Sequence, residues 1–245
     1  MSIGSRLGEH KYRDIANAPT NVGSNTMADT LIIQKAIEEL AAKSFGVTGQ
    51  FLDIHEVVYN NDVPRVERVT EKEDGTAIVY FPVVDQKFYL AIYLETVPAV
   101  LVTWVDIQPY HSVYFRASSE SLSLQELADL TKLTFTRGIK KGDRKNPNSR
   151  ADIVWKWSAI YFELNPGPEE FADKLTKLLD FLEQDKEGVE SLVKKANGYI
   201  QIYSSFHNGN TLIGGHHINI DHIKRMSKLK LEIDFDISAD GNFFK

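Results

Sequence analysis

The chain has 245 residues, of which 42% are hydrophobic and 25% charged, a composition typical of a soluble globular protein with one large domain or two small ones. It contains no cysteine, which excludes disulfides, thiolate catalysis and cysteine-ligated zinc. The formal net charge of −6 arises in the N-terminal half, because residues 1–110 hold nine Lys and Arg against 15 Asp and Glu, whereas residues 111–245 hold 19 of each. This balance argues against a nucleic-acid partner and fits a basic protein partner or simple solubility.

Residues 1–27 combine glycine, asparagine and serine with scattered apolar residues that follow no period, so we expect a flexible tail. The same stretch has no apolar centre of the kind that a secretory signal requires. No apolar run in the chain reaches the ~20 residues of a membrane-spanning helix. We therefore expect a cytoplasmic protein without a membrane partner.

Residues 28–110 predict a helix followed by an antiparallel β-meander. Asp29 is a suitable N-cap, apolar residues then recur at helical spacing, and Gly46 ends the helix. The following segments are rich in β-branched and aromatic residues and predict strands over 51–59, 65–70, 76–84, 88–95 and 100–107. Asp74-Gly75 is a hairpin signal between two of these strands. We expect the meander to curl so that one face packs on the helix.

Residues 111–245 predict a second domain, after a boundary at Pro109-Tyr110. Its strands are expected over 112–117, 133–137, 153–163, 199–206 and 231–237, with one helix after the first strand, two after the third and one after the fourth. This order is that of an α+β fold and resembles a ferredoxin-like sandwich, in which helices cover an antiparallel sheet.

The last predicted strand, 231–237, shows the plainest pattern of the chain. Apolar residues alternate there with the acids Glu232, Asp234 and Asp236, which is the period of a half-buried strand. Carboxylates spaced in this way could serve acid–base chemistry or bind a divalent cation. The alternation is already explained by a sheet with one solvent-facing side, and we adopt that interpretation.

Several features of the C-terminal half occur together, namely Gly142-Asp143 in a basic loop, Trp157-Ser158 in the central strand, a leucine-rich helix, and the ending Ile218–Ile237. With the opening strand and helix, they make residues 112–237 resemble the bacterial DUF4279 domain family, whose function is not assigned. Proteins that resemble this family are often small, and some look like immunity proteins of toxin systems. The resemblance thus implies a bacterial protein and suggests an immunity role.

The basic loop supplies the candidate anion- or partner-binding residues, which are Lys140, Lys141, Asp143, Arg144 and Lys145. Glycines in the loop would let backbone N–H groups approach a phosphate while the cations neutralise it. The Gly-Lys-Ser/Thr of a P-loop is absent. The alternative is a solvated loop in which Asp143 makes a turn.

Four histidines lie close in sequence: His207, His216, His217 and His222. Imidazole is a common metal ligand, and a weaker hypothesis places a metal between His217, His222 and Asp234. The spacing fits no metal-binding helix motif, and adjacent histidines diverge when the backbone is extended. We therefore expect polar loop histidines, no metal and no cofactor.

Trp155, Trp157 and Tyr161 fall on one face of the central predicted strand. Such rings could stack on bases or on another ligand. Because a leucine-rich helix follows, we expect them in the core instead.

These observations favour a non-enzymatic protein-binding module, in the form of a bacterial immunity or accessory protein whose acidic N-terminal half captures a basic partner such as a toxin. One alternative is a phosphate- or nucleotide-handling enzyme, or an anion-binding protein, that uses the loop from Lys140 to Lys145. Another is a structural homodimer formed by pairing exposed sheet edges.

Overall fold

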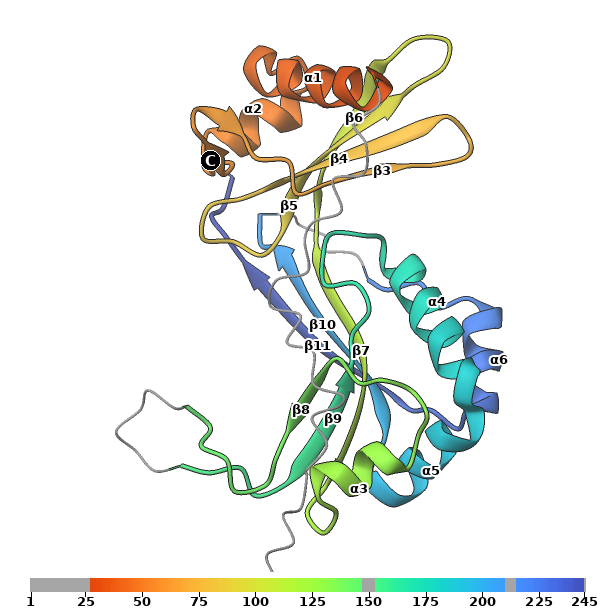
Figure 1. The fold of residues 1–245 in the computed structure, drawn as a ribbon. Helices are drawn as coiled ribbons and strands as arrows, with labels where there is room; N and C mark the ends of the chain where they lie inside the picture. Colours follow the sequence, from red (N-terminus) through yellow and green to blue (C-terminus); the bar gives the residue numbers. More distant parts are fainter. Residues whose placement is uncertain (1–26, 147–152, 210–214, 245) are drawn as a thin grey trace, which may run out of the picture.

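The computed structural model describes residues 27–146, 153–209 and 215–244. They form a four-stranded sheet with two helices, a five-stranded sheet with four helices, and a two-stranded hairpin (Figure 1). The predicted α+β class is confirmed. Among the described residues, no helix is both long and apolar enough to cross a membrane. The expected tail, residues 1–27, lies outside the described residues except for Met27.

The N-terminal sheet has the strand order β3-β4-β5-β6, all antiparallel as the meander predicts. Its strands are β3 (Arg68–Glu71), β4 (Thr76–Pro82), β5 (Tyr89–Glu95) and β6 (Leu101–Gln108). The helices α1 (Met27–Ala42) and α2 (Gly46–Leu52) pack on one face of it. The hairpin β1 (Tyr59–Asn60) and β2 (Val63–Pro64) lies between α2 and β3 in sequence.

The predicted strand over 51–59 is wrong, because α2 occupies the start of that range. Phe51 is fully buried against α1 and the sheet. The carboxylate of Glu39 in α1 accepts hydrogen bonds from the Phe45 N–H (3.1 Å) and the Thr48 hydroxyl (2.6 Å). A side chain of α1 thus accepts hydrogen bonds from residues at the start of α2 and stabilises this short helix. Strand propensity, which depends on neighbouring residues, does not include such a contact between helices.

The C-terminal sheet has the strand order β11-β10-β7-β9-β8. Its elements are β7 (Tyr110–Ser119), α3 (Leu124–Asp129), β8 (Arg137–Ile139), β9 (Ser158–Phe162), α4 (Phe171–Leu182), a 3₁₀ turn (Glu183–Asp185), α5 (Lys186–Ala196), β10 (Tyr199–His207), α6 (Ile220–Lys228) and β11 (Ile233–Asp240). The four strands β10-β7-β9-β8 are antiparallel and have the ferredoxin-like order, which confirms the predicted sandwich. β11 differs from the antiparallel expectation, because α6 carries the chain back across the sheet and β11 pairs parallel to β10.

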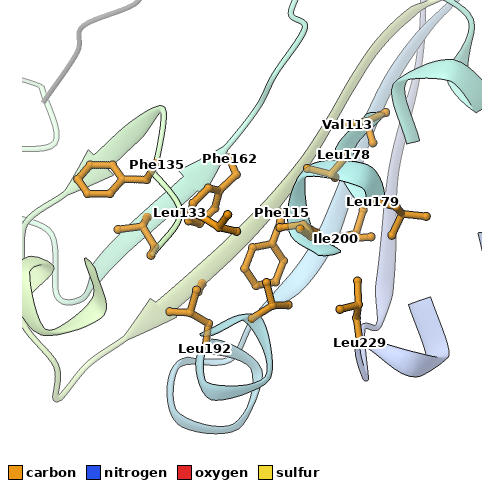
Figure 2. Close-up of a cluster of buried hydrophobic side chains, with 14 of the residues drawn as sticks. Val113, Phe115, Leu133, Phe135, Phe162, Leu178, Leu179, Leu192, Ile200 and Leu229 are labelled. Carbon is orange, nitrogen blue, oxygen red and sulfur yellow. The ribbon is translucent and has the colours of Figure 1, made fainter. Parts of the chain in front are cut away.

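All four helices of this half cover the same face of the sheet (Figure 1). Figure 2 shows the resulting core, in which Phe115, Phe162 and Ile200 of the sheet meet leucines of the helices. The residues that alternate with them, such as Arg116, Tyr161 and Asp234, must therefore point to the other face. No described helix covers that second face, which we call the open face.

Two joints connect the halves of the structure. At the first, the second face of the N-terminal sheet is buried at Tyr80, and Arg68 donates to Glu169 (3.2 Å), which Lys177 also pairs with. At the second, the Nε2 atoms of His55 and His207 lie 2.9 Å apart. The predicted domain boundary, Pro109-Tyr110, falls where β6 ends and β7 begins.

Candidate functional site

A row of four alternating rings and guanidinium groups crosses the open face of the C-terminal sheet. Strand pairing places Tyr199 of β10 opposite Arg116 of β7, Arg116 opposite Tyr161 of β9, and Tyr161 opposite Arg137 of β8. Directly opposed residues in a sheet have neighbouring side chains on the same face. We call Tyr199, Arg116, Tyr161 and Arg137 the Tyr/Arg row.

Cation–π contacts hold the row together. The guanidinium carbon of Arg137 lies 3.9 Å from the ring centroid of Tyr161, and that of Arg116 lies 5.8 Å and 5.9 Å from the rings of Tyr199 and Tyr161. Arg116 Nη1 also donates to the Tyr199 hydroxyl (3.1 Å). The rings therefore fix the position of both cations without neutralising them.

Two tryptophans and a lysine lie beside the row, next to Arg116. Arg116 lies 4.8 Å from the ring of Trp157, Trp157 packs on Trp155 with centroids 4.7 Å apart, and Lys145 lies 4.8 Å from the ring of Trp155. The expectation that Trp155 and Trp157 belong to the core is therefore wrong, whereas Tyr161 is buried, at 6% exposed, beneath Arg137. The core takes the other side of β9, Ile160 and Phe162, because α4 packs on that side.

The two arginines of the row keep unused binding capacity within the described part of the chain. Neither Arg116 nor Arg137 pairs there with a carboxylate. The Nε of Arg116 is buried and has no hydrogen-bond partner among the described residues. An Arg at such a site can still donate to a carboxylate or a phosphate.

The predicted anion-binding residues Lys140, Lys141, Asp143, Arg144 and Lys145 are all exposed, on a hairpin that joins β8 to β9. Most of their backbone N–H groups are occupied. The Gly142 N–H donates to Trp155 (2.9 Å), the Lys145 N–H to Ile153 (2.8 Å), and the Asp143 N–H to Lys140 (3.1 Å), the turn expected at this residue. These backbone N–H groups are therefore not available to bind a phosphate. Only the side chains of the hairpin can contact an anion.

The structure separates the histidines of the weaker metal hypothesis. His222 faces α4, where its Nε2 lies 2.8 Å from the Thr176 hydroxyl, whereas Asp234 projects from the open face and His217 is exposed. Within the described ranges, no group of three or more acidic or histidine side chains is placed to hold a metal. His207 and His216 lie in two further, separate contacts.

A serine between two histidines is the arrangement that most resembles a catalytic site. The Ser204 hydroxyl lies 2.9 Å from His111 Nδ1 and 3.0 Å from His216 Nε2. Burial lowers the pKa of both imidazoles, that of His111 to about 3, so both are neutral at pH 7. Ser204 is fully buried and His111 is 6% exposed, which leaves a substrate no access to this hydroxyl. We assign the cluster to the packing of β7 on β10.

The N-terminal half has an acidic end, formed by Asp29, Glu71, Glu73, Asp74 and Glu95, where α1 begins and the strands turn. A hydrogen bond with Asp29 raises the pKa of the Glu71 carboxyl, because the two acids lie close together. Leu101 and Trp104 of the edge strand β6 are 57% and 56% exposed. An exposed tryptophan on an edge strand is typical of a protein contact surface.

Aspartates occupy backbone donors at two edge strands. The Phe235 N–H in β11 donates to Asp234 (3.0 Å), and the Ile107 N–H in β6 donates to Asp106 (2.8 Å). Donors used in this way are not available to a second sheet. The homodimer through sheet edges stays a prediction, and these contacts weigh against it.

Sequence reasoning identified parts of this surface and missed its arrangement. It named the basic loop and one aromatic face but omitted Arg116 and Tyr199. A local signal existed, because Tyr114 and Arg116 alternate with the core residue Phe115. The missing information was the register of three strand pairs, which only the fold supplies.

The model of a family described as a domain of unknown function, DUF4279, matches residues 108–240, which include β7 to β11. This match covers more than half of the chain, and the protein belongs to that family. No curated protein and no solved structure matches the chain.

Proposed function

We propose that this member of the DUF4279 family is a non-enzymatic binding protein that takes an anionic partner on the open face of its C-terminal sheet. The observation that carries the proposal is the Tyr/Arg row, in which aromatic rings hold two arginines without supplying an anion. Positioned cations of this kind bind an incoming anion without first having to be ordered.

The charge around the row supports an anionic partner. The hairpin between β8 and β9 adds the exposed side chains of Lys140, Lys145 and Lys156. Acids of β11, including Asp234 and Asp236, lie on the same face beyond β10 and so bound the basic area on one side. The partner would consequently lie over the row itself, from Tyr199 of β10 across β7 and β9 to Arg137 of β8.

Thermal unfolding with inorganic polyphosphate tests this proposal, because a ligand that binds only the native state raises its melting temperature. The informative variant is the double substitution Arg137→Gln/Lys145→Gln, whose side chains are both exposed. The matched control is Lys224→Gln/Lys228→Gln, which removes the same charge from the exposed surface of α6, on the other side of the sheet. We expect polyphosphate to raise the melting temperature of the wild type and the control but not of the first variant. Equal shifts in both variants would contradict the proposal.

The acidic end favours a second candidate function, the capture of a basic protein. In this second function the chain would be a bacterial, cytoplasmic immunity or accessory protein that binds a basic toxin. A Lys or Arg from the partner would pair with the exposed carboxylates of Glu71 and Glu95, and the exposed Trp104 would add apolar contact area.

Binding of an oligolysine peptide at low and high salt tests this second candidate. Glu71→Gln/Glu95→Gln should weaken binding, whereas Glu187→Gln/Glu232→Gln, which removes two other exposed acids, should not. Oligolysine that fails to bind at low salt, or that binds all variants alike, would rule out the acidic end as the contact surface.

A further inference from the structure

We infer that the anionic partner of the open face is a single-stranded nucleic acid whose bases stack along the Tyr/Arg row. This inference rests on the proposed function and specifies its ligand. It also corrects the expectation, drawn from the net charge alone, that nucleic acid is excluded as a partner.

The position of the row within the sheet is the first argument. β7 and β9 are the central strands of the four-stranded ferredoxin-like sheet, and Arg116 and Tyr161 point from them to the open face. Tyr161 is 6% exposed beneath Arg137, so the planes open to a base are those of Arg137 and Tyr199 and of the two tryptophans. Single-stranded RNA is read by four-stranded sheets whose exposed aromatic residues stack two or three bases. The row crosses four strands that are each about 4.8 Å apart, so it spans roughly 14 Å. That width suits two or three bases.

The flat groups of the row are the second argument. Arg137 is exposed and lies over the Tyr161 ring, so the outer side of its guanidinium plane faces solvent. Bases stack on arginine planes as well as on aromatic rings. Trp155 and Trp157 are only partly buried and add two rings beside Arg116. An acidic peptide would pair with the cations but would make no use of these planes.

The hairpin between β8 and β9 supplies the third argument. Lys145 lies over the Trp155 ring, and Lys140 and Lys156 are exposed on the same hairpin, so these lysines supply cations for the phosphates that follow each stacked base. Rings for the bases and cations for the backbone are the two components of single-strand binding surfaces. The acids of β11 then repel the nucleic acid from the sheet edge beyond β10 and limit its path to the row.

The experiment is a titration of the full chain with an oligouridine of about ten nucleotides, enough to exceed the two or three bases on the sheet. The chain has three tryptophans, so the substitution Trp104→Phe leaves Trp155 and Trp157 as the only tryptophan reporters, both beside the row. We expect stacked bases to quench their fluorescence. In this background, Arg137→Gln/Lys145→Gln should weaken binding at least ~10-fold, since one stacking contact alone contributes about 1–3 kcal/mol. Lys224→Gln/Lys228→Gln should leave it unchanged.

Salt dependence adds a readout that a loss of folding would not mimic. Because Lys145 contacts a phosphate and Arg137 stacks on a base, the double variant loses one phosphate contact, which should reduce the slope of log K against log salt by about 0.7. Tight binding of polyglutamate, with no quenching by oligouridine, would refute the inference of a nucleic-acid ligand but would still support an anionic partner. If neither polyglutamate, polyphosphate nor oligouridine depends on Arg137 and Lys145, the proposed function fails as well.

Discussion

The buried Lys174 makes a specific prediction about how the free energy of unfolding depends on pH. Its side chain in α4 is 4% exposed and donates to the His111 carbonyl (2.5 Å). Burial lowers the pKa of its ammonium from the ordinary 10.5 to about 8, although Glu163 and Glu169 act in the opposite direction. Between these two values the unfolded chain carries a proton that the folded chain has lost, so unfolding becomes harder as pH rises.

The size of the effect follows from the same values. A decrease from 10.5 to about 8, at about 1.36 kcal/mol per pKa unit, amounts to roughly 3 kcal/mol. About 2 kcal/mol of this falls between pH 8 and pH 10, from the linkage relation. Lys174→Met removes the titrating group, so the variant should lack this gain.

Urea unfolding of the wild type and of Lys174→Met at pH 8 and pH 10 measures the difference directly. Lys224→Met is the matched control, because it removes an exposed lysine from α6. We expect the wild type and the control to gain about 2 kcal/mol more than Lys174→Met over this range. Equal gains in all three proteins would refute a buried, easily deprotonated Lys174.

Two further predictions concern glycine and histidine. Gly188→Ala should destabilise the fold by about 1–3 kcal/mol or more, because the added Cβ overlaps the Asp185 carboxylate. Gly49→Ala should instead stabilise α2 by about 0.5–1 kcal/mol, because there is open space around this glycine. Urea unfolding of both variants checks the two signs. Burial lowers the pKa of both His55 and His207, so the joint they form should lose stability as pH falls below the ordinary value of 6.5. Thermal melts of wild type and His55→Gln across this range should show a weaker pH dependence in the variant, and identical profiles would contradict the role of the pair.

Local pattern predicted most of the architecture, because most elements bury a face with a clear period. The alternation at 231–237 predicted β11 and its solvent-facing acids, and Ile233 and Phe235 do pack on the core while Asp234 and Asp236 are exposed. The Ser123 capping box predicted α3, and both of its hydrogen bonds are present. In both cases the residues that determine the element are close together in the sequence.

The failures have long-range causes. α2 depends on the Glu39 carboxylate from α1, and the parallel pairing of β11 depends on where α6 crosses the sheet. The prediction of Trp155 and Trp157 in the core fails because the sequence does not say which face of β9 receives the helix. The same choice of face assembles the Tyr/Arg row, since Arg116 and Tyr161 meet only through the pairing of β7 with β9. The sequence pattern therefore lacked the register of the strand pairs, which the prediction of both the fold and the site required.

The most direct test of the Tyr/Arg row as a binding surface is an NMR titration of the full chain with inorganic polyphosphate. The side-chain N–H groups of Arg116 and Arg137 in the row, and those of Trp155 and Trp157 beside it, serve as reporters. The Nε–H of Arg116 is the most informative of them, because it is buried and has no partner among the described residues. The account predicts that these side-chain resonances shift first and together. Shifts confined to exposed lysines of α6, with the Arg116 resonance unmoved, would contradict it.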